Sequence, residues 1–199
     1  LGELTSELMS SYEEDKSSRE EWLDGFSKGL DLLGIKAEDR DQPFAGASGV
    51  THPLLSEATT QFQAQAYKEL LPPNGPVSTK VVGEETPESV AQANRVKEFM
   101  NYQITEVMED YDPEMDQLLF HLPLSGSAFK KVYYDPLMER PCAMFVPSED
   151  FVASYGASDL KTCPRYTHVM KKTANEVLQL QVNGFYRDVD LPEPQPDYS

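Results

Sequence analysis

Residues 124–152 read LSGSAFKKVYYDPLMERPCAMFVPSEDFV, and the fold class follows from this stretch. Its segments 128–134 and 142–146 are rich in aromatic and β-branched residues, with prolines between them. Segments 150–154 and 165–170 have a similar composition. Short runs of this kind, separated by turn residues, are typical of antiparallel strands. The sequence therefore predicts a small, mainly antiparallel sheet in this part of the chain.

Helical periodicity dominates the chain before this stretch. Four apolar residues follow one another at spacings of four, four and three: Trp22, Phe26, Leu30 and Leu33. This spacing places them on one face of a helix. We expect that helix to run over about 6–33 and to be weakest at Ser17-Ser18, because serine is a poor helix former.

Three more helices are predicted before the sheet and one after it. The first starts near Pro53, with an apolar side formed by Leu55, Ala58, Phe62, Ala66 and Leu70. The second opens at Thr86-Pro87, with a buried stripe formed by Ala93, Val96, Met100, Ile104, Val107 and Tyr111. The third starts at Asp112-Pro113, with Met115, Leu118, Leu119 and Leu122 facing inward until Pro123 and Gly126 interrupt it. Ala174–Val182 is the last helix, and Val77–Val82 is predicted as a strand.

These patterns predict an α+β fold in which N-terminal helices pack with a small, mainly antiparallel sheet. Residues 1–126 form the mainly helical region, and residues 127–190 form a small β-rich portion of the same domain. Residues 191–199 contain three prolines, and such composition is typical of a connector. We expect it to lead to a further C-terminal part.

The chain has 34 acidic and 17 basic side chains among 199 residues, a formal charge of −17. Residues 1–41 hold 12 acids and 5 bases, and residues 84–116 hold 10 and 2. Residues 117–172 hold 5 acids and 7 bases and form the one positive block. An acidic surface repels phosphates, so salt-dependent clamping of nucleic acid by a basic face is disfavoured. No apolar run reaches the ~18 residues of a membrane-spanning helix. The two cysteines, Cys142 and Cys163, are interpreted as free thiols.

No motif for catalysis, a cofactor or a metal stands out. The three histidines lack metal-binding spacing, and the serines lack the G-x-S-x-G pattern. Acidic pairs such as Glu13-Glu14-Asp15 are interpreted as solvated surface. We therefore predict that the protein is not an enzyme and has no catalytic, cofactor-binding or metal-binding residues. A weaker alternative is a hydrolase that uses Glu84, Glu85, Glu109 and Asp110.

Two blocks carry a resemblance to a known family. Residues 41–55, DQPFAGASGVTHPLL, follow the helix over 22–33, and residues 124–136 and 140–152 form the second block. Together they resemble the N-terminal wing and adjoining body of phage portal proteins, the head-to-tail connectors, particularly those of short-tailed phages. Such a fold would be wing-like. The match covers roughly residues 22–155 and contains no catalytic signature.

The resemblance implies a ring of twelve subunits at one vertex of the capsid, assembled in the host cytoplasm. Double-stranded DNA would pass through the ring during packaging and ejection, without sequence-specific binding. The implied partners are the terminase, tail or adaptor proteins, the capsid protein and further copies of the chain, with no membrane. The channel-lining helix and the clip of such a protein would follow Ser199 or lie in another part of a longer chain. The alternative is an acidic, non-enzymatic adaptor or scaffolding-type protein of a virion.

Two groups of residues are candidates for subunit contacts. The first is the loop that carries Phe44, Gly46, Ser48, Gly49 and His52, where a large apolar residue stands among small ones. It either contacts a neighbour or packs inside its own subunit. The second group consists of the pairs Lys130-Lys131 and Lys171-Lys172. They either meet the acidic helices of a neighbour or neutralise their own sheet.

Overall fold

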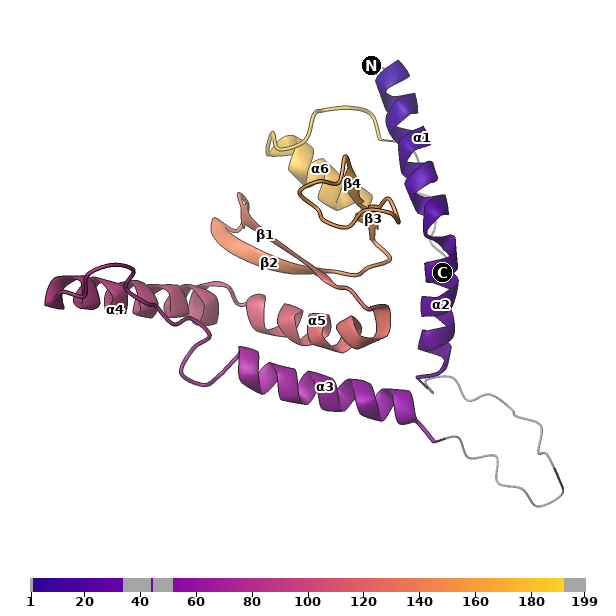
Figure 1. Cartoon of the computed structure of the whole chain (residues 1–199). Coiled ribbons are helices and arrows are strands. Elements are labelled where there is room, and N and C mark those ends of the chain that lie inside the picture. Colours follow the sequence, from indigo (N-terminus) through magenta and orange to yellow (C-terminus); the bar gives the residue numbers. More distant parts are fainter. Residues whose placement is uncertain (1, 34–43, 45–51, 192–199) are drawn as a thin grey trace. The chain divides into compact units, whose positions relative to one another are not determined.

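Six α-helices and four short strands follow one another along residues 2–33 and 52–191 of the computed structural model, which also describes Phe44 (Figure 1). The helices are α1 (Gly2–Ser18), α2 (Glu20–Asp31), α3 (Leu54–Leu70), α4 (Pro87–Tyr102), α5 (Tyr111–Ser125) and α6 (Ala174–Val182), and the π-helical turn η1 (Gln103–Val107) continues α4. The strands are β1 (Phe129–Asp135), β2 (Arg140–Val146), β3 (Phe151–Ala153) and β4 (Tyr166–His168). The predicted α+β fold is confirmed.

The chain divides into two compact units, Leu1–Thr167 and His168–Ser199. Helix α6 belongs to the second unit, and the other helices belong to the first. The division at 126/127 and 190/191 stays a prediction. Along residues 2–33 and 52–191 no helix is both long enough and apolar enough to cross a bilayer.

The helix predicted over 6–33 is in fact two helices, α1 and α2, with Arg19 between them. The hydroxyl of Ser18 donates to the carbonyl of Asp15 at 2.7 Å, next to the break. Such a local bond competes with the helical hydrogen bonds, so the helix breaks beside its predicted weak point. Phe26, on the predicted apolar face, is buried.

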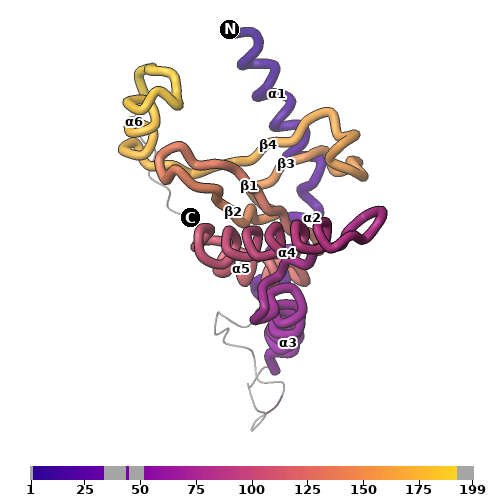
Figure 2. The backbone as a smooth tube through the Cα atoms, turned by 90° about the vertical axis from the view of Figure 1, so that its left-hand side faces the viewer, coloured from indigo at the N-terminus to yellow at the C-terminus, as the bar shows by residue number. Residues whose placement is uncertain are grey.

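Helix α5 lies between the β1–β2 hairpin on one side and α3 on the other (Figures 1 and 2). Leu119 of α5 is buried as predicted. The prediction that Pro123 interrupts this helix is wrong, because α5 continues to Ser125. A proline so near the helix end removes one hydrogen bond, and the Ser125 hydroxyl donates to the carbonyl of His121 at 3.0 Å in the same turn. Gly126 then ends the helix, as predicted, with a φ of +76°, a value that favours glycine.

Strands β1 and β2 form the predicted antiparallel hairpin. Their register pairs Phe129 with Val146 at one end and Asp135 with Arg140 at the other. The buried residues of the hairpin all lie on β2: Cys142, Ala143, Phe145 and Val146. Strands β3 and β4 form a second two-stranded sheet, so the strands predicted at 150–154 and 165–170 exist but are shorter.

Phe62, on the apolar side predicted for α3, is exposed. Polar side chains join α3 to α5 instead. Gln63 donates to a carboxylate oxygen of Asp116 at 2.7 Å, and the Tyr67 hydroxyl donates to Asp112 at 2.5 Å. Apolar periodicity does not detect a helix pairing of this kind.

The strand predicted at Val77–Val82 does not form in the single chain. Its β-branched composition favours a strand, but a strand also needs a second strand beside it. Neither two-stranded sheet of the described residues includes this segment.

Candidate interaction surface

Arg19, at the break between α1 and α2, is buried, with 7% of its surface exposed. Its Nη1 atom donates to the carbonyls of Ser148 at 2.7 Å and Phe151 at 2.8 Å, and its Nη2 atom donates to the carbonyl of Glu149 at 2.5 Å. The guanidinium also lies 5.5 Å from the centre of the Trp22 ring. A planar cation with several fixed donors suits such a cluster of carbonyls. Arg19 therefore ties the N-terminal helices to the turn between β2 and β3.

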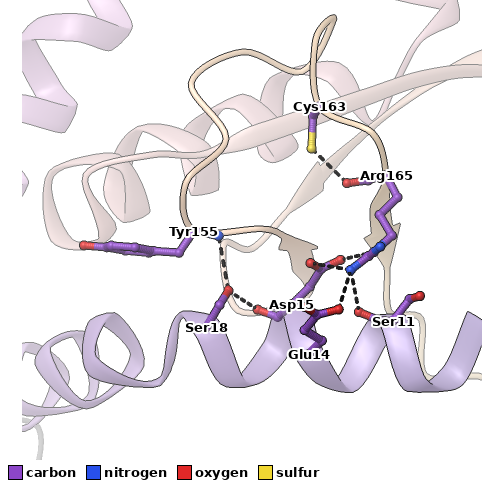
Figure 3. A network of polar contacts seen from close by, with 7 residues as sticks. All are labelled: Ser11, Glu14, Asp15, Ser18, Tyr155, Cys163 and Arg165. Atoms are coloured by element: carbon purple, nitrogen blue, oxygen red, sulfur yellow. Dashed lines mark hydrogen bonds and ion pairs between the residues drawn. The ribbon is translucent and has the colours of Figure 1, made fainter.

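A second arginine fastens α1 to the chain just before β4 (Figure 3). Arg165 donates to Asp15 from Nε at 2.6 Å and from Nη2 at 3.0 Å, and Nη2 also donates to the carbonyl of Ser11 at 3.2 Å. The hydrogen bond to Asp15 raises the pKa of Arg165. Asp15 is buried, so the prediction that the acidic run of α1 is solvated is wrong for this residue. A buried carboxylate needs such a partner.

Two carboxylates at the start of α5 face the outer edge of β2. The N–H of Ala143 donates to Asp110 at 2.6 Å, and the N–H of Phe145 donates to Glu114 at 2.5 Å. Pro141, the remaining residue of β2 on that edge, has no N–H. Unpaired backbone N–H groups on an edge strand can form hydrogen bonds with a strand of another chain, which leads to aggregation. The carboxylates therefore close this edge of the hairpin.

Asp110 also forms an ion pair with Arg140. Partial burial by itself would raise the pKa of Asp110, but the hydrogen bonds from Arg140 and Ala143 outweigh it and hold the pKa below its ordinary value. A carboxylate whose pKa is lowered by folding contributes stability above its unfolded pKa of about 4, and this contribution is lost as the pH falls through the folded pKa.

We expect acid to remove this contribution, and Asp110→Asn isolates it. The amide oxygen of asparagine can still accept the hydrogen bond from the N–H of Ala143, but the amide group does not titrate. Between neutral pH and about pH 3, the free energy of unfolding should therefore fall further in the unaltered protein than in the variant. Urea denaturation at each pH measures the difference. An identical pH dependence in both proteins would contradict the role assigned to Asp110.

The structure places the two predicted lysines of β1 in different surroundings. The Nζ atom of Lys130 lies 3.6 Å from the centre of the Tyr111 ring, and burial lowers the pKa of Lys130. Lys131 is exposed, with its Nζ atom 5.4 Å from the centre of the Tyr133 ring. Lys130 therefore contacts its own chain, whereas Lys131 is the more accessible cation. A contact of either lysine with a neighbouring subunit stays a prediction.

The structure describes four of the other predicted contact residues: Phe44, His52, Lys171 and Lys172. Lys171 and Lys172 are exposed and belong to the second unit. Phe44 is 69% exposed, so it does not pack inside the described part of its own chain. His52 is exposed, and its carbonyl accepts a hydrogen bond from the N–H of Leu54 at 2.9 Å. The remaining predicted loop residues lie outside the described residues: Gly46, Ser48 and Gly49.

Large apolar side chains are exposed on several helices of the first unit. On α1 they are Leu4, Leu8 and Met9, and on α3 they are Leu54, Phe62 and Leu70. On α4 they are Val90, Val96, Phe99, Met100 and Tyr102, so the buried stripe predicted for α4 is wrong at Val96 and Met100. Single exposed apolar residues are ordinary, whereas contiguous apolar patches mark interaction surfaces.

A groove of about 560 Å³ between α3 and α5 contains none of the four carboxylates of the hydrolase alternative. It is lined in part by Tyr67, Asp112 and Asp116. The Tyr67 hydroxyl donates to Asp112, and this bond raises the pKa of Tyr67. Asp110 is already bound to Arg140 and the β2 edge. Within the ranges that the structure describes, no group of three or more His, Cys, Asp or Glu residues could hold a metal.

Sequence reasoning missed the side chains that fasten these elements: Arg19, Arg165, Asp110 and Glu114. Each acts on backbone or side-chain atoms far away in the sequence. The one local signal is the four-residue spacing of Asp110 and Glu114, which places both carboxylates on one side of a helix end.

Comparison with known proteins adds no family. No protein-family model matches the sequence, and no curated protein matches it. The function must therefore be inferred from the residues and their arrangement.

Proposed function

We propose that this chain is the wing and adjoining body of a phage portal protein, in a ring of twelve copies at one capsid vertex. Double-stranded DNA passes through the ring during packaging and ejection. The terminase docks on the ring during packaging, and tail or adaptor proteins take its place afterwards. The protein is a structural component of the virion and not an enzyme.

The exposed apolar side chains of α1, α3 and α4 are the observation that carries the proposal. They occur on a chain with a formal charge of −17. Copies with this charge repel one another, and salt screens that repulsion over a Debye length of about 8 Å at physiological ionic strength. Burial of apolar surface between neighbours supplies the opposing attraction.

The order of elements in the second resembling block also supports the proposal. That block reads as a helix ending in small residues, a strand with basic and aromatic residues, a turn and a second strand. Helix α5 ends at Ser125-Gly126, and the β1–β2 hairpin follows directly.

The acidic charge suits a passage for DNA. A protein that neutralises phosphates with lysine and arginine binds DNA strongly in a salt-dependent way. A conduit must let the duplex slide, so weak binding is useful. The charge of −17 makes strong non-specific binding of phosphates unfavourable.

Electron microscopy of the full-length protein tests the proposal. We expect rings with a central opening wide enough for a DNA duplex. Particles without a central opening would contradict it. Monomers that bind another virion protein would favour the acidic adaptor or scaffolding-type protein instead.

A further inference from the structure

The outer edge of β1 is open in the single chain. The backbone N–H groups of Ala143 and Phe145 point away from β1, because they donate to Asp110 and Glu114. The residues of β2 that alternate with these two are therefore the ones whose backbone groups bond to β1. The β1 residues whose backbone groups point outward are therefore Lys130, Val132 and Tyr134. No hydrogen bond reaches these backbone groups within the described residues. Val132 is 65% exposed and Tyr134 is 63% exposed, so the side chains also remain accessible.

A second segment has the properties of a strand without a partner. From Val77 to Val82, half-buried and exposed residues alternate one by one, as in a strand with one covered face. The segment is held on α4, because the Thr79 hydroxyl donates to the carbonyl of Ala93 at 3.0 Å. Val82 is 96% exposed.

The side chain of Asn101 in α4 hydrogen-bonds to backbone groups along one edge of this segment. Its Oδ1 atom accepts from the N–H of Val77 at 2.9 Å, and its Nδ2 atom donates to the Val77 carbonyl at 3.1 Å. In an extended segment, Ser78, Lys80 and Val82 direct their backbone groups to the opposite edge. Within the described residues no backbone hydrogen bond is made at that edge.

We propose that residues 77–82 of one copy add as an antiparallel strand to the open edge of β1 in the next copy. The proposal rests on the ring proposed above and identifies one of its subunit contacts. Addition of a strand to an exposed sheet edge is a common mode of recognition, because main-chain hydrogen bonds provide the affinity. It also gives the β-branched segment the partner strand that it lacks in the single chain.

Charge and side-chain matching favour this occupant. Cross-strand pairs of opposite charge stabilise a sheet. With Val82 opposite Val132, Lys80 lies opposite the aromatic ring of Tyr134. Glu84 and Glu85, which follow the segment, then reach the end of β1 that carries the two lysines. Gly83, with a φ of +106°, ends the extended segment before these acids.

The contact is heterologous, which is the kind that a cyclic ring requires. Each copy contributes residues 77–82 on one side and the β1 edge on another. Every contact around the ring therefore uses the same two surfaces. Self-pairing of β1 would instead produce an isologous dimer.

Disulfide crosslinking of the full-length protein tests the proposal. The variants are Val82→Cys and Val132→Cys, both at exposed positions, in a Cys163→Ser background; Cys142 is buried. Cα atoms of directly opposed strand residues are about 5.5 Å apart, within the range that a disulfide spans. Mixing the two single variants under mild oxidation should give dimers joined through residues 82 and 132. The double variant should give a ladder of higher multimers.

Lys131→Cys is the matched control, because neighbouring residues on a strand point to opposite faces. Paired with Val82→Cys, it should crosslink at least about tenfold less than Val132→Cys. Three outcomes would each overturn the inference. They are dimers joined only through residue 132, a disulfide within one chain of the double variant, and protein that still oligomerises but forms no crosslinks. If rings form without the crosslink, this contact is refuted but the portal proposal is not. If the crosslink forms in particles that have no central opening, only the portal proposal is refuted.

Discussion

Arg19→Met is expected to lower the free energy of unfolding by about 3 kcal/mol or more. Methionine keeps much of the apolar volume of the side chain but leaves the carbonyls of Ser148, Glu149 and Phe151 without their donor. Hydrogen bonds from a charged donor contribute more than neutral ones, and three are lost at a buried position. The N-terminal helices should therefore separate from the turn before β3 at a lower urea concentration.

The fluorescence of Trp22, the one tryptophan of the chain, reports on this event directly. Its ring lies beside the Arg19 guanidinium and stacks on Phe26, with ring centroids 5.5 Å apart. Arg19→Lys serves as the control, because it keeps the charge without the planar set of donors and should lose an intermediate amount. A change below about 0.5 kcal/mol in Arg19→Met, the range of ordinary surface substitutions, would show that Arg19 does not hold the helices.

The second large effect is expected at the closed edge of β2. Asp110→Ala and Glu114→Ala each remove the acceptor for a backbone N–H of a buried residue, Ala143 or Phe145. An unsatisfied buried N–H costs about 1–3 kcal/mol. The double variant should lose more than either single variant, and its exposed strand edge should make it aggregate more readily.

Urea denaturation measures the loss of stability, and amide hydrogen exchange at Ala143 and Phe145 locates it. The control on the same helix is Gln117→Ala, which changes an exposed side chain and should alter stability by less than about 0.5 kcal/mol. If the two amides exchange at unchanged rates in the double variant, the carboxylates do not close this edge.

The features predicted correctly from the sequence are those set by nearby residues. The β1–β2 hairpin follows from composition and turn residues within about 20 positions, and α6 has the predicted bounds Ala174–Val182. These features depend on propensity and periodicity, which a sequence contains directly. At Ser17-Ser18 the sequence predicted only a weak point inside one helix, whereas the structure has two helices that meet at Arg19.

The features that were missed depend on distant partners. Arg19 meets carbonyls about 130 positions away, and no local pattern distinguishes it from a surface arginine. The apolar stripe of α4 was predicted to be buried, but Val96 and Met100 are exposed, as is Phe62 on the apolar side of α3. Periodicity indicates that an apolar face needs a partner, without telling whether that partner is the same chain or another copy.

We propose that copies of this acidic chain cover one another's apolar surfaces. Sedimentation velocity of the full-length protein at several salt concentrations measures whether the copies associate. From about 0.01 M to 0.15 M salt the Debye length falls from about 30 Å to about 8 Å, which weakens repulsion between the copies. We expect a discrete oligomer whose population grows with salt, the opposite of the salt dependence of DNA binding. A single-chain mass at every salt and protein concentration would contradict the account.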